Sequence, residues 1–207
     1  MIDDLKKIQI TIFSELRLPP GLFKGAMEEL RALGFEDIGV RPEILILKTS
    51  DVYIVVAENG IIRADFYELS KRIDEIIKKL IKLIVKLSKR EKDLPTFFTD
   101  TELIYEIKGK NKPKETLLNL INQKLIKEIS TSFKKNTVSS GLRIILGDIN
   151  KPPATSFRIE PLLRNEDYYY YSAWSTFPLR EQTDLLRKIR KLDKLAFKFL
   201  DILEKGT

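Results

Sequence analysis

The chain of 207 residues contains no cysteine and no histidine. Without cysteine there is no disulfide, no thiolate metal site and no cysteine nucleophile. Without histidine, serine-hydrolase triads, histidine-ligated zinc and imidazole acid–base catalysis are excluded as well. Any catalysis would have to use carboxylates, lysines, hydroxyls or a carboxylate-held Mg²⁺. The composition therefore favours a binding protein over an enzyme, and it predicts no cofactor.

Glycine loops and long apolar runs are also missing. The nine glycines form neither G-x-x-x-x-G-K nor G-x-G-x-x-G, so a nucleotide-binding loop has no support. No apolar run is long enough to span a bilayer, and the opening MIDDLKKIQI begins with acidic residues, unlike a signal peptide. With 43% apolar residues the chain can still bury a core. We expect a cytoplasmic protein that does not bind membranes.

The charge of the chain is positive, with a net value of +7 and a pI of about 9.4. One interpretation is a highly charged, thermophile-like surface on which Lys and Glu serve stability. The other is a basic surface that binds a polyanion. Net charge alone leaves both interpretations open.

The first half of the sequence alternates between strand-like and helix-like patterns. In IQITIF, isoleucines alternate with polar residues as in a half-buried strand, and short polar turns separate three later strand-like runs. LSKRIDEIIKKLIKLIVKLSKR has the apolar stripe of a long helix. The predicted elements are a strand at Ile8–Arg17, a helix at Leu22–Leu33, strands at Glu43–Lys48, Val52–Ala57 and Ile61–Phe66, and a helix at Leu69–Arg90.

The second half follows the same order of elements. Its predicted elements are a strand at Thr101–Gly109, a helix at Lys114–Ile129, strands at Leu142–Asp148, Ser156–Leu163 and Asp167–Phe177, and a helix at Leu179–Lys205. We predict an α+β fold of two β-α-β-β-β-α halves, 1–94 and 95–207, which can form one continuous domain. The halves would share a largely antiparallel sheet with helices packed on one face and the other face open to water.

One predicted helix has more apolar surface than a single contact requires. Ile81, Leu83 and Val85 broaden the stripe near the end of the helix at 69–90. This extra surface suits a homodimer formed through helix 69–90.

Aromatic residues concentrate in DYYYYSAWSTF, at Asp167–Phe177. In a strand, alternate side chains point to opposite faces. The set with Tyr169, Tyr171, Ala173 and Phe177 is the more apolar one and is predicted to meet the helices. The remaining set would face outward. It contains Tyr168, Tyr170 and Trp174, with Arg158 and Arg143 expected beside it. Aromatic rings on an open sheet can stack with bases, although cross-strand packing explains tyrosine in strands equally well.

The twofold strand–helix–three strands–helix order resembles the fold of the TATA-binding protein. The closest local likeness is VYIVVAENGIIRADFYELSKRIDEIIKKL, Val52 to Leu80, which looks like the passage that ends one repeat of that saddle. The resemblance implies a saddle whose sheet lies on DNA, but the specific function of that family is not carried over to this chain.

Two further segments have charged side chains that suit phosphate binding or metal-dependent catalysis. KGKNKPK contains Lys108, Lys110 and Lys112 in a predicted loop, where they can contact phosphates or be solvated. The same region contains Glu106-Ile107-Lys108, the Glu-x-Lys half of a PD-(D/E)xK nuclease site, in which carboxylates hold Mg²⁺. The companion acid would be Asp93 or Asp100.

We therefore predict a non-enzymatic nucleic-acid-binding protein, with DNA favoured over RNA. It would use the open sheet face, through Tyr168, Tyr170, Trp174, Arg143, Arg158, Lys108, Lys110 and Lys112, and it would contain no metal site. One alternative is a Mg²⁺-dependent nuclease using Glu106 and Lys108. Another is a protein-interaction module that does not bind nucleic acid.

Overall fold

The computed structural model describes residues 4–88, 97–121, 123–133, 141–147, 154–179 and 184–205 of the chain. Its strands are β1 (Leu5–Phe13), β2 (Asp37–Val40), β3 (Ile44–Lys48), β4 (Val52–Ala57), β5 (Ile61–Phe66), β6 (Phe97–Lys108), β7 (Leu142–Leu146), β8 (Thr155–Pro161) and β9 (Tyr168–Leu179). Its helices are the 3₁₀ helix η2 (Pro20–Ala26), α1 (Met27–Ala32), α2 (Arg72–Leu87), α3 (Pro113–Asn119), α4 (Gln123–Phe133) and α5 (Leu185–Lys205).

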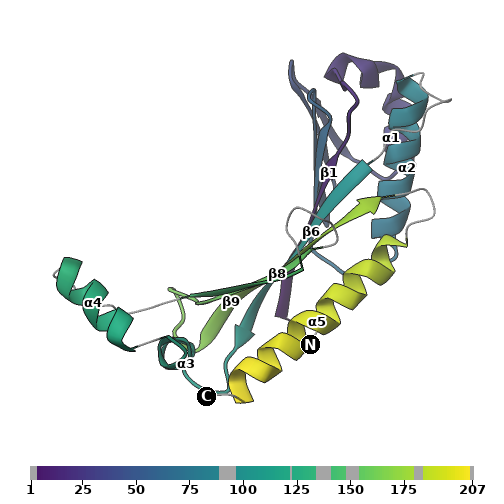
Figure 1. Cartoon of the computed structure of the whole chain (residues 1–207). Coiled ribbons are helices and arrows are strands. Elements are labelled where there is room, and N and C mark those ends of the chain that lie inside the picture. The colour runs from purple at the N-terminus through teal and green to yellow at the C-terminus, as the bar shows by residue number, and fades with distance from the viewer. Residues whose placement is uncertain are drawn as a thin grey trace.

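Within the described ranges, all nine strands form one antiparallel sheet in the order β2-β3-β4-β5-β1-β6-β9-β8-β7. Each half places its first strand at the centre, where β1 and β6 pair from Leu5↔Tyr105 to Phe13↔Phe98. The sheet is strongly curved, and its two halves bend toward each other (Figure 1). The predicted α+β class with a largely antiparallel sheet is confirmed.

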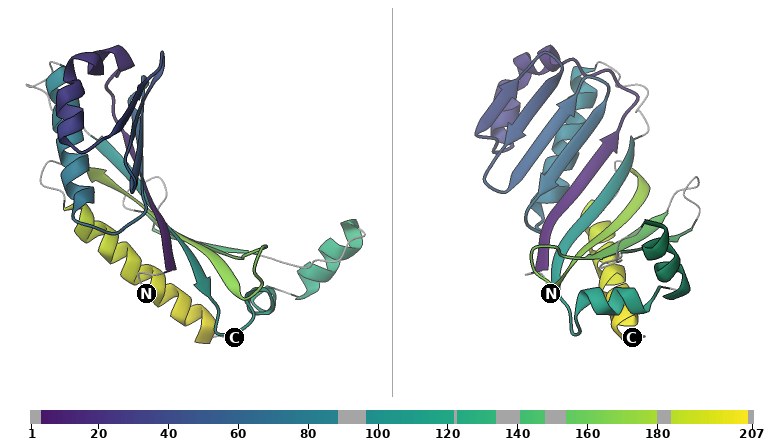
Figure 2. Two further views of the ribbon diagram at one scale, coloured as in Figure 1. Left: turned by 180° about the vertical axis from the view of Figure 1, so that it is seen from behind. Right: turned by 90° about the vertical axis from the view of Figure 1, so that its left-hand side faces the viewer.

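The helices α1, α2 and α5 cover one face of the sheet, and the concave face has no helix layer over its centre (Figure 2). The strand sequences explain this arrangement, because alternate residues are apolar and buried. In β4, for example, Val52, Ile54 and Val56 are buried on the helix side, while the residues between them are only partly covered. Two-residue alternation therefore gives a single core between the sheet and the helices.

The extra apolar surface of α2 is buried within the chain. Leu83 and Val85 are buried, and both belong to the core cluster that also contains Leu30 of α1. An ion pair between Lys86 and Glu29, with Nζ and Oε1 3.6 Å apart, also joins α2 to α1. Of the three residues from which a homodimer through helix 69–90 was predicted, Leu83 and Val85 are thus buried within the chain and Ile81 is partly buried.

The first half contains one strand more than the sequence predicts. The short edge strand β2 pairs with β3 from Asp37↔Lys48 to Val40↔Leu45. The second half has the three strands expected after its helical segment, but that segment is two helices, α3 and α4. The chain leaves α3 at Leu120, and α4 extends away from the sheet (Figure 1).

The two halves are joined by their helices as well as by the sheet. The backbone N–H of Leu186, in the first turn of α5, donates to Oδ1 of Asp74 in the first turn of α2, at 3.1 Å. Asp74 therefore caps a helix in the other half of the chain. The boundary predicted at residues 94 and 95 lies outside the described residues.

Candidate nucleic-acid interface

The four consecutive tyrosines of β9 alternate between the two faces of the sheet. Tyr169 and Tyr171 are fully buried on the helix side, whereas Tyr168 and Tyr170 are partly exposed on the open side. Trp174 lies in the same outward-facing register and is also partly exposed. The predicted division of this strand into an inner and an outer set is confirmed.

Two buried tyrosines on the helix side, Tyr171 of β9 and Tyr105 of β6, are held by hydrogen bonds and ring contacts to α5. The hydroxyl of Tyr171 donates to the carbonyl oxygen of Ala196 at 2.8 Å, and that of Tyr105 in β6 donates to Asp193 at 2.8 Å. The rings of Tyr105 and Tyr171 stack with centroids 5.7 Å apart. Burial raises the pKa of Tyr171, and burial followed by the Asp193 carboxylate raises that of Tyr105. Both remain neutral hydrogen-bond donors.

On the open face, the outer rings stand in cross-strand rows between charged residues. Tyr170 is opposite Glu106 on one side and Glu160 on the other, and Trp174 is opposite Glu102. We use the term ring surface for the four aromatic side chains on this side of β9 and β6: Tyr168, Tyr170, Trp174 and Phe98. It runs along β9 and reaches β6, a central strand of the sheet.

Phe98 was not among the residues that sequence reasoning selected, and neither was Phe13. They are opposite each other across β1 and β6, and their exposed fractions are 40% for Phe13 and 44% for Phe98. The sequence does indicate the position of Phe13. Because Ile8, Ile10 and Ile12 alternate on the buried side of the strand, Phe13 falls on the open side. Phe98 was missed because the strand was predicted to begin three residues later.

The predicted arginines also lie on this face, at its outer edge. Arg143 in β7 is directly opposite Arg158 in β8. Arg158 is bound by Glu160, with Nη2 and Oε1 2.7 Å apart, and this contact raises the pKa of Arg158. Nε of Arg143 donates to the hydroxyl of Ser156 at 3.4 Å. The structure brings these two cations together next to the rings of β9.

Carboxylates occupy the centre of the open face. Asp100, Glu102 and Glu106 follow one another along β6, and Glu106 forms an ion pair with Arg164. Desolvation raises the pKa of the Asp100 carboxyl, while hydrogen bonds with the side chains of Thr176 and Trp174 oppose the shift.

The described charges on the central and second-half strands of the open face balance. Its described cations in the central and second-half strands are Lys7, Arg63, Lys108, Arg143 and Arg158, and its carboxylates are Asp65, Asp100, Glu102, Glu106 and Glu160. Several of them pair with each other, as Asp65 does with Lys7 at 3.5 Å and with Arg63 at 3.3 Å. A ligand would therefore meet rings and paired charges on this face, without a strongly positive field.

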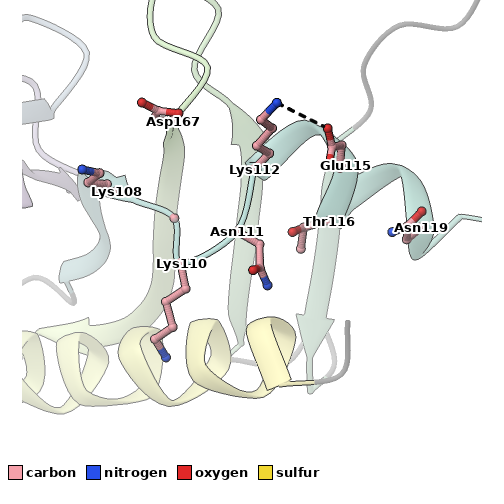
Figure 3. Close-up of a pocket in the computed structure, with 9 residues that line it drawn as sticks. Lys108, Lys110, Asn111, Lys112, Glu115, Thr116, Asn119 and Asp167 are labelled. Atoms are coloured by element: carbon pink, nitrogen blue, oxygen red, sulfur yellow. Dashed lines mark ion pairs between the residues drawn. The ribbon is translucent and has the colours of Figure 1, made fainter.

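The three predicted lysines do not converge on one point. They line an open cavity of about 710 Å³ between the end of β6 and α3, together with Asn111, Glu115 and Thr116 (Figure 3). Nζ of Lys110 is 3.5 Å from both Asp201 and Glu204 of α5, and Nζ of Lys112 is 3.8 Å from Glu115. Lys108 extends in a third direction and, in register, is opposite Tyr168. Of these three lysines, Lys108 alone adds charge to the open face.

The two described acids of the nuclease alternative, Glu106 and Asp100, are far apart. Glu106 and Asp100 are six positions apart on β6, about 20 Å at the rise of an extended strand. Two carboxylates at that distance cannot share one Mg²⁺ ion. Asp93 lies outside the described residues, and no group of three Asp or Glu side chains among the described ones is arranged to hold a metal ion.

Comparison with protein-family models gives no match, and comparison with curated protein sequences gives none either. Of the helices that the structure describes, none combines the length and apolar character needed to cross a bilayer.

Proposed function

We propose that this protein binds nucleic acid, with DNA favoured, through the ring surface of its open sheet face. The observation that carries the proposal is the row of partly exposed rings on β9, on a face that no helix covers at its centre. Proteins that bind single strands without strict sequence preference stack bases on such rings, and each stacked base contributes about 1–3 kcal/mol.

The charge of this face favours contact with bases over contact with phosphates. A nearly neutral surface releases few counterions, so phosphate neutralisation supplies little affinity there. Carboxylates beside the rings can accept hydrogen bonds from base amino groups, as Asp and Glu do from cytosine N4. We therefore expect single strands, whose bases are free to stack, to bind this face more tightly than duplexes.

Phosphate contacts in this proposal come from the edge of the ring surface. Arg158 and Arg143 lie one and two strands beyond the rings, where a strand stacked on β9 would have its backbone. Because Arg158 is paired with Glu160, its phosphate contact requires exchange of partners and adds modest affinity. In the family that the order of elements resembles, the sheet lies on the minor groove of duplex DNA, so the same titration includes a duplex.

The experiment uses Trp174, the only tryptophan of the chain, as the reporter. Labelled single-stranded and duplex oligonucleotides are titrated at two salt concentrations, following anisotropy and tryptophan fluorescence. We expect binding with quenching of Trp174, and Tyr170→Ala should weaken binding by roughly 5- to 150-fold. The control is Tyr67→Ala, because Tyr67 is 50% exposed but follows β5, which β1 and β6 separate from β9.

If neither single strands nor duplexes change in anisotropy at low salt, the proposal is wrong. The alternative of a protein-interaction module that does not bind nucleic acid would then be favoured. Cleavage of the oligonucleotide in Mg²⁺ that Glu106→Ala abolishes would instead support the nuclease.

A further inference from the structure

The outer surface of α5 is a cationic ridge. Four side chains, Arg187, Lys191, Lys194 and Lys198, repeat at intervals of four, three and four residues and therefore share one side of the helix. Arg190 adjoins them, and all five are exposed. The opposite side of α5 is buried on the sheet through Leu185, Ile189, Leu192, Ala196, Leu200 and Leu203. Packing of α5 therefore fixes the backbone positions from which the cations extend.

The ridge lacks the acidic partners found elsewhere on the helix layer. On α2, Lys79 pairs with Glu75 and Arg72 with Asp51. On the ridge, Arg187 is 3.9 Å from Asp184, and within the part of the chain that the structure describes no carboxylate pairs with the other four cations. Asp193 is on α5, but it accepts the hydrogen bond of Tyr105.

This arrangement is unfavourable for the isolated fold. Arg190 and Lys194 are four residues apart, as are Lys194 and Lys198, and like charges at this spacing destabilise a helix. A surface shaped by stability alone would alternate the two signs. Helix α5 contains seven Lys and Arg residues against three Asp and Glu, so more than half of the net charge of +7 resides on it. The repulsion is relieved when an anionic partner binds.

We propose that the α5 ridge binds the phosphate backbone of a second nucleic-acid segment, on the side of the molecule opposite the open face. The inference rests on the proposed function, because it makes the protein a bridge between two segments. From Arg187 to Lys198 the ridge is about 16 Å long, which matches about five phosphates of one strand at 3.4 Å each. Membrane insertion does not fit, because the apolar side of α5 is covered by the sheet.

The test compares two charge-matched variants of the full chain. The ridge variant carries Arg190→Gln, Lys191→Gln, Lys194→Gln and Lys198→Gln. The control variant carries Lys71→Gln, Lys78→Gln, Lys79→Gln and Lys82→Gln in and next to α2, so the two variants have the same net charge. Circular dichroism first confirms that both fold. Bridging is measured as capture of a labelled duplex by protein held on a bead-bound single strand.

We expect the ridge variant to lose at least tenfold in captured duplex and to keep single-strand binding with Trp174 quenching. The salt dependence of capture should become shallower by about 3–4 units of slope, at about 0.9 for each phosphate that the variant no longer neutralises. Unchanged capture by the ridge variant, or an equal reduction in the control variant, would overturn the inference while the proposed function stands. So would equal capture of polyglutamate or of phosphatidylserine vesicles in place of the duplex.

The two proposals can fail separately. Suppose that the wild type shows no Trp174 quenching but binds the duplex, and that the ridge variant does not bind it. The proposal that the ring surface binds nucleic acid is then wrong, whereas the ridge remains a nucleic-acid site.

Discussion

The two buried tyrosines of β9 allow a paired test of hydrogen bonding between the sheet and the helix layer. The Tyr171 hydroxyl donates to the carbonyl of Ala196 at 2.8 Å, so Tyr171→Phe removes a buried hydrogen bond. The Tyr169 hydroxyl is equally buried and has Thr116 beside it, but no described group meets it in hydrogen-bond geometry. The same chemical change should therefore have different effects at two positions that are two residues apart.

The magnitudes follow from the cost of unmet hydrogen bonds. Removal of a typical intramolecular hydrogen bond lowers the free energy of unfolding by about 1 kcal/mol, so we expect that effect for Tyr171→Phe. A buried hydroxyl without a partner costs about 1–3 kcal/mol, so Tyr169→Phe should leave stability unchanged or raise it by up to about 1 kcal/mol. In a chain of this size each kcal/mol corresponds to a shift in Tm of about 2–4 °C.

Urea denaturation monitored by circular dichroism measures both variants against the wild type at pH 7. Equal m-values would show that the comparison concerns the folded state. Equal destabilisation by the two substitutions would refute the reasoning, because it would mean that Tyr169 has a hydrogen-bond partner of the same quality. Destabilisation by Tyr169→Phe alone would show that the hydroxyl of Tyr169, and not that of Tyr171, has the stabilising hydrogen bond.

Two further predictions concern carboxylates. Asp74→Ala should lower the free energy of unfolding by about 1 kcal/mol, because it removes the capping contact with Leu186 that joins the two halves. Glu75→Ala, at the adjacent exposed position, should change the free energy of unfolding little. Chemical denaturation of the two variants measures the difference. Asp100→Asn should raise stability at pH 7, because desolvation raises the pKa of Asp100 and disfavours its charged form in the fold. That gain in stability should shrink as the pH falls through the raised pKa of the folded state toward the unfolded value of 3.8, because the wild-type carboxyl is then protonated too. A gain that grows as the pH falls would contradict a raised pKa for Asp100.

The face of each strand could be predicted because it depends on a local pattern. In β1 the isoleucines at 8, 10 and 12 alternate with polar residues, and all three are buried. In β9 the prediction depended on which tyrosine set had the more apolar companions, Ala173 and Phe177, and those residues are buried on the helix side. Patterns of period two therefore identify the open surface without any tertiary contact being known.

Elements that depend on tertiary contacts could not be predicted in the same way. Strand β2 has four residues, one of them Gly39, and no alternating pattern; it exists because β3 offers it a partner. Helices α3 and α4 share one continuous amphipathic pattern, but α3 packs on β8 while α4 leaves Leu125 and Ile129 exposed at 49% and 42%. An apolar period of 3.6 residues predicts a helix, but it does not predict where tertiary packing ends that helix.

The distribution of charge is the other property that composition conceals. A net charge of +7 suggested a basic binding face, and the aromatic strand suggested where it would be, but the fold separates the two features. Pairing in the sheet puts Glu102 opposite Trp174 and Glu106 opposite Tyr170, whereas the helical period collects Lys191, Lys194 and Lys198 on the reverse side of the molecule. Under the two proposals, base stacking belongs to the ring surface, and the larger share of the phosphate contacts belongs to α5. Salt dependence should follow substitutions on α5 and base preference should follow substitutions on β9, so titrations at several salt concentrations can assign each part of the affinity to its own surface.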